Sequence, residues 1–382
     1  MSHQKPNVID LFAGVGGFSL GALRAGFHLA LAVELDKHAI SAHQLNFPKF
    51  NHLVADISSL DGKQLMYHAG LEIGELEGLI GGPPCQGFSS MGKRNASDIR
   101  NNLFVKFFKL VKDCHPTFFV AENVLGILNT QYTSTRRNAF GYVEDDYVLL
   151  DPIKLRAFDF GASTTRERVF FIGYRSEAME TISHEDFEAR KVKTVTTVAD
   201  ALLGLPSEID SNWLTEAESW RRVQPLPDSP FWNRVSNYIP KNVGDAEALR
   251  RYKEENMVSG CFGTRHSPEV LERYRRLKPG EHDKISKAVR LKMDGLCPTL
   301  RAGTGSDRGS FQAVRPIHPT LPRVITPREA ARLQGFPDWF RFAPSKWHSF
   351  RQIGNSVSPI VAEMVFEVIG NQLSQSLKCN YE

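Results

Sequence analysis

Cys85 stands in the part of the sequence best suited to chemistry, residues 82–89 with the sequence GPPCQGFS. An apolar run over residues 78–81 predicts a buried strand just before it. The two prolines stiffen the backbone ahead of the thiol, and the glycines and serines after it predict a segment able to close over a substrate. This polar, glycine-rich setting favours a nucleophilic thiolate over the buried, unreactive thiol that most free cysteines form.

A glycine-rich turn, residues 10–18 (DLFAGVGGF), follows an apolar run over residues 7–12 and precedes a helix-like stretch. Glycines allow a tight strand-to-helix turn and a close approach of the backbone to a ligand. Glu34 ends the next predicted strand, where a carboxylate can accept hydrogen bonds from ribose hydroxyls. Asp56 ends the third, where it could meet an adenine amino group, and Phe12 suits stacking on that adenine.

The turn departs from the G-x-G-x-x-G pattern of dinucleotide sites, because Gly16 and Gly17 are followed by Phe18, Ser19 and Leu20. The departure favours a nucleoside cofactor that lacks a pyrophosphate, and S-adenosylmethionine is the obvious case. A nicotinamide-dependent dehydrogenase is the alternative that the turn alone leaves open.

The elements that must position these residues alternate between strand and helix. Predicted strands cover residues 7–12, 29–34, 52–56, 78–81, 117–121, 147–153 and 168–173, and a helix covers residues 101–114. Such alternation predicts an α/β, Rossmann-like fold with a doubly wound parallel sheet. After about residue 174 the alternation fades, which indicates a second, smaller and irregular domain. A final helix is expected over residues 361–377, with one apolar face made of Val361, Met364, Val365, Val368 and Ile369.

Composition narrows the class of protein. With 382 residues, 41% of them apolar, the chain can bury a large core. A net charge of +4 permits a polyanionic partner without requiring one. The five cysteines are irregularly spaced with no C-x-x-C pair, which argues against disulfides and a zinc site and for a reducing compartment. With no signal-peptide pattern and no apolar stretch long enough to cross a membrane, we expect a soluble, cytoplasmic protein without a metal.

Six motifs resemble those of the DNA cytosine-5 methyltransferases, in the order usual for that family. They are residues 10–17 (DLFAGVGG), 83–89 (PPCQGFS), 122–124 (ENV), 166–168 (RER), 326–337 (TPREAARLQGFP) and 352–357 (QIGNSV). They span most of the chain, from residue 8 to about 365. Thr164 departs from the pattern, since the family usually has glutamine there. The departure affects the polar contact at that position and leaves the two arginines in place.

The resemblance implies a bacterial DNA cytosine-C5 methyltransferase of the restriction-modification type that uses S-adenosylmethionine. Cys85 would attack C6 of a cytosine flipped out of the duplex, and Glu122 would bond N3 and the exocyclic amine. Arg166 and Arg168 would place positive charge near the carbonyl oxygen and the thiolate, with a structural role equally open for Arg168. The resemblance assigns cofactor binding to Phe12, Gly14, Val15, Gly17, Glu34, Leu35, Asp56, Ile57, Pro84, Leu103, Asn355 and Ser356.

Residues 190–295 carry none of the family's motifs. This absence is expected of a target-recognition region. Basic residues outnumber acids between residues 265 and 315, and the glycine-rich loop 300–309 (LRAGTGSDRG) could present Arg301 and Arg308 to guanine edges. Ser89, Lys93 and Arg94, which follow Cys85, would contact the flipped nucleotide and its phosphates. A solvated charged surface is the alternative for about half of the basic residues.

We therefore expect a catalytic and cofactor-binding domain over residues 1–190, a target-recognition domain over 191–345 with the 325–340 motif at its hinge, and a C-terminal helix over 346–382 that returns to the first domain. Double-stranded DNA is the expected partner of a monomer, and a restriction endonuclease would be encoded nearby. Two alternatives remain. The large basic region argues against a tRNA cytosine-C5 methyltransferase, and the set of Cys85, Glu122 and Arg166 argues against a catalytically silent DNA-binding protein.

Overall fold

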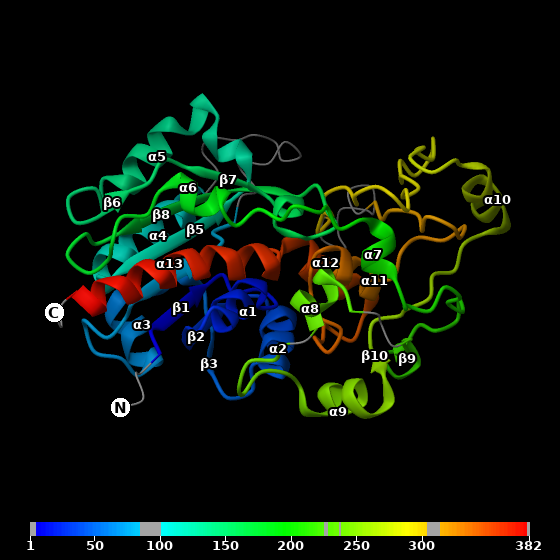
Figure 1. Cartoon of the computed structure of the whole chain (residues 1–382), viewed down its shortest axis with the longest axis horizontal. Coiled ribbons are helices and arrows are strands. Elements are labelled where there is room, and N and C mark those ends of the chain that lie inside the picture. The colour runs from blue at the N-terminus through cyan, green and yellow to red at the C-terminus, as the bar shows by residue number, and fades with distance from the viewer. Residues whose placement is uncertain (1–4, 85–100, 225–227, 237, 304–313, 380–382) are drawn as a thin grey trace.

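An eight-stranded mixed sheet forms the centre of the protein (Figure 1). The computed structural model describes residues 5–84, 101–224, 228–236, 238–303 and 314–379. The strands lie in the order β3-β2-β1-β4-β5-β8-β6, and β7 pairs with β8. Their bounds are β1 Asn7–Leu11, β2 His28–Glu34, β3 Asn51–Val54, β4 Gly78–Gly81, β5 Phe118–Asn123, β6 Val148–Leu149, β7 Ile153–Arg156 and β8 Glu167–Tyr174.

The sheet is parallel from β3 to β5, and β8 runs antiparallel to β5, β6 and β7. The predicted α/β fold is confirmed, but the prediction of a wholly parallel sheet is wrong at this edge. The connection 157–166 between β7 and β8 is too short for the crossover that parallel strands need. The strand predicted over residues 147–153 is broken into β6 and β7, because Pro152 has no backbone donor for the ladder.

Helices cover both faces of the sheet. Their bounds are α1 Gly17–Arg24, α2 Lys37–Asn46, α3 Gly62–Ala69, α4 Asn101–Cys114, α5 Thr133–Phe140, α6 His184–Glu188, α7 Val198–Leu202, α8 Pro230–Ser236, α9 Ala246–Glu255, α10 Pro268–Arg276, α11 Pro327–Leu333, α12 Lys346–Asn355 and α13 Pro359–Cys379. Successive residues of β5 face opposite sides, as the pleat requires: Phe118 and Val120 join the core under α1 and α13, whereas Phe119 and Ala121 join the core under α3 and α4.

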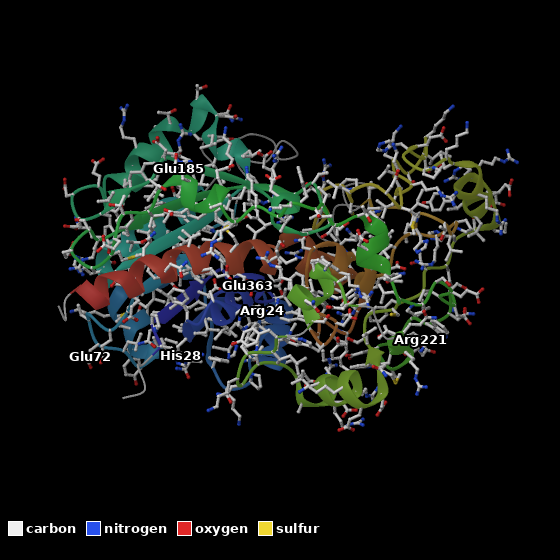
Figure 2. The ribbon with its side chains drawn as sticks, viewed as in Figure 1. Arg24, His28, Glu72, Glu185, Arg221 and Glu363 are labelled. Atoms are coloured by element: carbon white, nitrogen blue, oxygen red, sulfur yellow. The ribbon has the colours of Figure 1, made fainter. Side chains whose placement is uncertain are left out.

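The first and last helices pack directly on each other. The predicted apolar face of the C-terminal helix is confirmed, since Val361, Met364, Val365, Val368 and Ile369 are all buried. Arg24 of α1 lies 3.7 Å from the carboxylate of Glu363 on α13, and the two lie close together at the centre of the molecule (Figure 2). Arg24 also donates to the backbone carbonyls of Arg234, Val235 and Tyr238. These bonds hold the end of α8 and the residues that follow it against α1.

The region between residues 190 and 325 has few regular elements among its described residues, as expected. It holds α7 to α10 and a two-stranded sheet of β9 (Arg221–Arg222) and β10 (Met257–Val258), and it extends to the right of the main sheet in Figure 1. The chain then returns through α11 and α12 to α13. The domain bounds given above stay a prediction. In the described chain, one stretch, residues 346–373, is apolar and long enough to cross a membrane, but 72% of its apolar window is buried inside the protein, as in a core helix.

The close contact of α1 with α13 generates a stability prediction. A Cβ at Gly21 would lie 2.3 Å from the Cβ of Ala362 and 2.5 Å from the backbone nitrogen of Glu363. Gly21→Ala should therefore lower the free energy of unfolding by about 1–3 kcal/mol through overpacking, measured by urea denaturation. Gly370→Ala in α13 is the matched control, because its new Cβ would meet nothing nearer than 3.5 Å and should gain up to about 1 kcal/mol of helix propensity. Equal effects from the two substitutions would contradict the prediction.

Candidate active site

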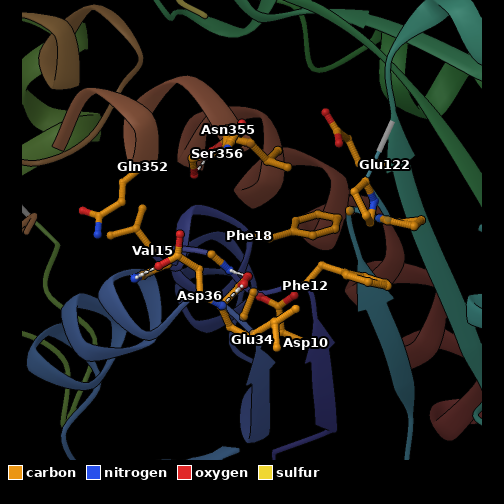
Figure 3. A pocket seen from close by; sticks show the side chains of 18 of the residues that line it. Asp10, Phe12, Val15, Phe18, Glu34, Asp36, Glu122, Gln352, Asn355 and Ser356 are labelled. Carbon is orange, nitrogen blue, oxygen red and sulfur yellow. Dashed lines mark hydrogen bonds between the residues drawn. The ribbon is translucent and has the colours of Figure 1, made fainter. Parts of the chain in front are cut away.

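A cavity of about 330 Å³ lies at the carboxyl ends of the parallel strands, where α/β sheets bind their ligands (Figure 3). Its volume suits a small-molecule ligand. Segments from both ends of the chain line it, because α12 returns to the N-terminal turn. The lining includes most of the predicted cofactor residues, namely Phe12, Gly14, Val15, Glu34, Leu35, Asp56, Ile57, Pro84, Leu103, Asn355 and Ser356.

The glycine turn owes its shape to left-handed backbone conformations. Phe12, Gly14 and Gly16 have φ angles of 59°, 57° and 99°. Glycine adopts such angles without strain, whereas phenylalanine does not. A strained backbone like that of Phe12 is common at ligand-binding sites. Gly17 lies outside the cavity lining, and a Cβ there would lie 2.2 Å from the Ser356 hydroxyl oxygen. Its small size therefore serves the packing of the terminal motif against the turn, and direct contact of Gly17 with a cofactor stays a prediction.

Glu34 is held at the floor of the cavity by the turn itself. One carboxylate oxygen accepts from the backbone N–H of Gly14 at 2.9 Å and the other from that of Asp36 at 2.8 Å. Burial raises the pKa of this carboxyl above its usual value. Each oxygen keeps lone-pair capacity for a further donor, which suits a pair of ribose hydroxyls. Phe12 lies beside it, so the residues present fit the nucleoside half of S-adenosylmethionine.

Glu122 lies across the cavity from Glu34 (Figure 3). Its carboxylate Oε1 is 2.8 Å from Nε of Arg168, which comes from the antiparallel neighbour β8. Next to Glu122, the Asn123 side chain donates to the carbonyl of Pro83 at 3.2 Å and so fixes the proline loop against the end of β5. Cys85 itself lies outside the described residues, but its neighbour Pro84 lines the same cavity.

The two arginines predicted to act together have different surroundings. Arg166 is 3% exposed, and its Nη1 donates to the carbonyls of Gly354 at 3.0 Å and Leu300 at 3.4 Å. It therefore joins Leu300, where the loop predicted to contact DNA begins, to the end of α12. Arg168 is the arginine that forms the ion pair with Glu122. This geometry supports a reactive-site role for Arg168 and a positioning role for Arg166.

Thr164, the departure from the family pattern, is fully buried where the region between residues 190 and 325 meets the sheet. It forms a parallel bridge with Cys297, completed by hydrogen bonds from the backbone N–H of Thr165 to the Cys297 carbonyl and from that of Cys297 to the Ser163 carbonyl. The backbone makes these contacts, and the buried Thr164 hydroxyl forms no hydrogen bond with any described residue.

Of the residues predicted to contact DNA, only Arg301 lies in the part of the chain that the structure describes. Ser89, Lys93, Arg94 and Arg308 lie outside the described residues. Arg301 is exposed, and its carbonyl accepts from Arg315 at 2.9 Å. Other basic residues of the region serve the protein itself: Arg273 pairs with Asp283, and Arg290 donates to the carbonyls of Pro319, Tyr274 and Leu277. These two arginines therefore have partners within the protein. The alternative of a solvated charged surface stays a prediction.

The late motif forms a buried polar cluster on α11. Arg332 makes a two-point ion pair with Asp338, with distances of 2.7 and 2.6 Å, and also donates to the carbonyl of Leu203. Arg328 donates to the carbonyls of Ser259, Pro337 and Phe340. Gln334 donates to the carbonyls of Ile353 and Ser356 beside the cavity. These bonds connect the region between residues 190 and 325 to the wall of the cavity.

Sequence reasoning missed several residues that line the cavity. Asp10, Asp36, His38, His348, Arg351 and Gln352 are among them. His38 and His348 stack with ring centroids 3.9 Å apart, and Gln352 donates to the His38 carbonyl at 2.9 Å. Only Asp10 and Gln352 had a signal in the sequence, because each is the first residue of a motif quoted above, residues 10–17 and 352–357. Within the part of the chain that the structure describes, no cluster of three or more His, Cys, Asp or Glu side chains could hold a metal.

The sequence matches the model of one family over nearly its whole length, residues 6–371: C-5 cytosine-specific DNA methylase. Type II methyltransferase M.XorII of Xanthomonas oryzae is 38% identical, over 98% of this chain and 86% of that protein. Type II methyltransferase M.DdeI of Desulfomicrobium norvegicum is 32% identical, over 95% of this chain and 88% of that protein.

Solved structures agree with this match. A crystal structure of a prophage-encoded DNA modification methyltransferase from Escherichia coli is 50% identical with a TM-score of 0.87, over 97% of this chain and all of that one. The Dnmt2 methyltransferase of Schizosaccharomyces pombe has a TM-score of 0.62 over 97% of this chain and 99% of that one. At 18% identity, the second comparison concerns the fold alone.

The buried pair on α11 generates a second prediction. Arg332→Met should lower the free energy of unfolding by about 3–5 kcal/mol, because it leaves the carboxylate of Asp338 buried without its partner. The double variant Arg332→Met/Asp338→Leu should recover much of that loss, since neither charge remains. Chemical denaturation of both variants checks this. A double variant no more stable than the single one would contradict the account.

Proposed function

The chain belongs to the family of C-5 cytosine-specific DNA methylases, and we propose that it methylates one cytosine within a specific duplex sequence through a covalent adduct of Cys85. It is a DNA cytosine-5 methyltransferase, and S-adenosylmethionine is its methyl donor. The observation that carries the proposal is the ion pair of Glu122 with Arg168, which lies across the cavity from Glu34 and next to the loop that leads to Cys85.

The residues of this chain divide the chemistry into steps. The Cys85 thiolate adds to C6, forming a carbon–sulfur bond and breaking the 5,6 double bond, so that electron density develops at C5. The sulfonium of bound S-adenosylmethionine supplies the methyl group that C5 takes. The C5 proton then passes to water, the electrons of the carbon–hydrogen bond restore the 5,6 double bond, and the carbon–sulfur bond breaks to release the thiolate. Only the complete cycle returns Cys85 to its starting state.

Glu122 and Arg168 are suited to hold the base during these steps. A carboxyl group at the strand end can accept from the exocyclic amine and share a proton with N3, which stabilises the charge that develops in the ring. Arg168 forms an ion pair with that carboxylate and would bring positive charge beside the carbonyl oxygen of the base. We assign this charge to Arg168, because the Nη1 of Arg166 already serves two backbone carbonyls.

A stacked base could not reach this cavity, so the target cytosine must flip out of the duplex, at a cost of roughly a few kcal/mol. Ser89, Lys93 and Arg94 would contact the flipped nucleotide and its phosphates, and Arg301 and Arg308 would read base edges. The relatives from Xanthomonas oryzae and Desulfomicrobium norvegicum are Type II methyltransferases. By this relationship we also propose a monomeric cytoplasmic enzyme that protects DNA from an endonuclease encoded nearby.

The substrate class can be tested directly. Duplex DNA with many sequence contexts should incorporate labelled methyl groups, and tRNA should not. Bisulfite sequencing of the product should place every modified C5 within one short recognition sequence. Transfer to tRNA with duplex DNA left unmodified would favour the alternative, a tRNA methyltransferase.

The roles of Cys85 and Glu122 predict different effects on a covalent trap. DNA with 5-fluorocytosine at the target cannot lose the C5 substituent, so the wild-type enzyme should remain bound through denaturing electrophoresis. Cys85→Ser should form no adduct and transfer no methyl group, yet bind the cofactor. Glu122→Gln should still form the adduct but react about 10²–10⁴-fold more slowly.

Cys114→Ala is the matched control for this experiment. Burial raises the pKa of its thiol to about 12, and it lies away from the cavity, so trapping should be unchanged. Normal methyl transfer by Cys85→Ser would refute the covalent mechanism.

A further inference from the structure

A chain of four polar side chains runs through the core from the cofactor cavity toward the surface. Asp10 lines the cavity and is 1% exposed. Its Oδ2 lies 2.5 Å from the Ser19 hydroxyl, and that hydroxyl lies 3.1 Å from Nε2 of His43. Nδ1 of His43 lies 2.9 Å from Nε2 of His52, which is half-buried. His52 also hydrogen-bonds the backbone of Phe50.

These contacts allow two complete arrangements of protons. When Asp10 is protonated, it donates to Ser19, Ser19 to His43 Nε2, His43 Nδ1 to His52 Nε2, and the remaining His52 nitrogen to the Phe50 carbonyl. When Asp10 is ionised, every side-chain bond reverses. His52 then donates from both ring nitrogens and carries the charge. One proton thereby moves from Asp10 to His52 while every bond is kept, with no change in the total number of protons.

Asp10 is poised between these two forms near neutral pH. Burial raises the pKa of its carboxyl to about 7, offset in part by the Ser19 hydrogen bond, and Glu34 raises it further. Burial also lowers the pKa of His43 and of His52, so neither imidazole holds the proton strongly. The second oxygen of Asp10, Oδ1, is buried and accepts no hydrogen bond from any described residue, which leaves it available to a ligand.

We propose that Asp10 is the counter-ion of the sulfonium of S-adenosylmethionine, and that Ser19, His43 and His52 carry its proton to the surface when the cofactor binds. The inference rests on the proposed function only for its cofactor. A positive charge in the cavity favours the ionised carboxyl, so the proton released from Asp10 leaves through His52 to solvent. The demethylated product has an uncharged sulfur and lacks that attraction. The relay thus favours the charged cofactor over the spent one.

The sign of the pH dependence follows from this linkage. A bound cation lowers the pKa of Asp10 from about 7, so affinity for S-adenosylmethionine should rise with pH between the bound and free pKa values and level off above pH 7. Each unit by which the pKa falls corresponds to about a tenfold gain in affinity. Other charged or titratable groups also face the cavity, and they are the ones a substitution must exclude: Glu34, Asp36, His38, Asp56, Glu122, Arg166, Arg168, His348 and Arg351.

Isothermal titration calorimetry of the full chain tests the proposal without DNA. Titrations with S-adenosylmethionine at about pH 6 to 8, in buffers of different ionisation enthalpy, should show release of about half a proton near pH 7. S-adenosylhomocysteine should release less and depend less on pH. Asp10→Asn should abolish the release and bind S-adenosylmethionine about tenfold or more weakly at pH 8.

Variants of the relay separate the proton pathway from a merely structural role. Ser19→Ala removes a bond that lowers the pKa of Asp10, so the midpoint of the affinity profile should move to higher pH. In stopped-flow experiments with a pH indicator, its proton release should lag behind binding. His28→Gln changes an exposed histidine of β2 that does not belong to the relay (Figure 2). This variant should behave as the wild type.

Two results would overturn the proposal: wild-type protein that binds the cofactor without releasing a proton, or equal pH dependence for the cofactor and its product. Release that persists in Asp10→Asn would also assign the titration to another cavity group. If that variant fails to fold, the wild-type titrations still decide. Because these experiments measure binding alone, an enzyme that methylates DNA but shows no linked proton would refute the relay and leave the proposed function intact.

Discussion

Close contact between the two ends of the chain is the constraint on which the site depends. Gly17 lets Ser356 and Val357 approach the glycine turn, Gly21 lets α13 lie directly on α1, and Gly354 lets α12 touch the backbone at Ala302. Side chains at these positions would overlap backbone or buried atoms. The cavity has a wall from residues 351–357 only because of this packing. The same packing connects the cavity wall to the backbone at Ala302.

Buried arginines hold that arrangement together. Burial of their charge is unfavourable, and nearby hydrogen-bond acceptors offset this desolvation cost. Arg328 and Arg332 are fully buried, and each has several carbonyl or carboxylate partners. A buried guanidinium without such partners would be strongly destabilising, so the cluster specifies one arrangement of α11 and its neighbours. Arg166 has a comparable role nearer the site, where it bonds to Leu300 on one side and Gly354 on the other. The region between residues 190 and 325, the cavity wall and the start of β8 therefore meet at a few arginines.

The sequence predicted much of the fold because strands of a buried sheet have a strong local signal. β4 and α4 have the predicted bounds, and β1, β2, β5 and β8 differ by one or two residues at either end. The antiparallel edge was not predictable from apolar periodicity, because a buried strand has the same pattern in either direction. Its consequence is large. Only the antiparallel pairing of β5 with β8 brings Arg168 beside Glu122.

By itself, the sequence determined the family motifs, the order of the main elements and the acids at the strand ends, since each depends on neighbouring residues. The tertiary structure decided which groups meet. It gave Arg166 and Arg168 different partners, placed His38 against His348, and aligned Asp10, Ser19, His43 and His52 across four elements. These contacts join residues far apart in the chain, and a hydrogen bond depends on positions within a few tenths of an ångström. No local pattern carries that information, because packing of the whole chain sets it.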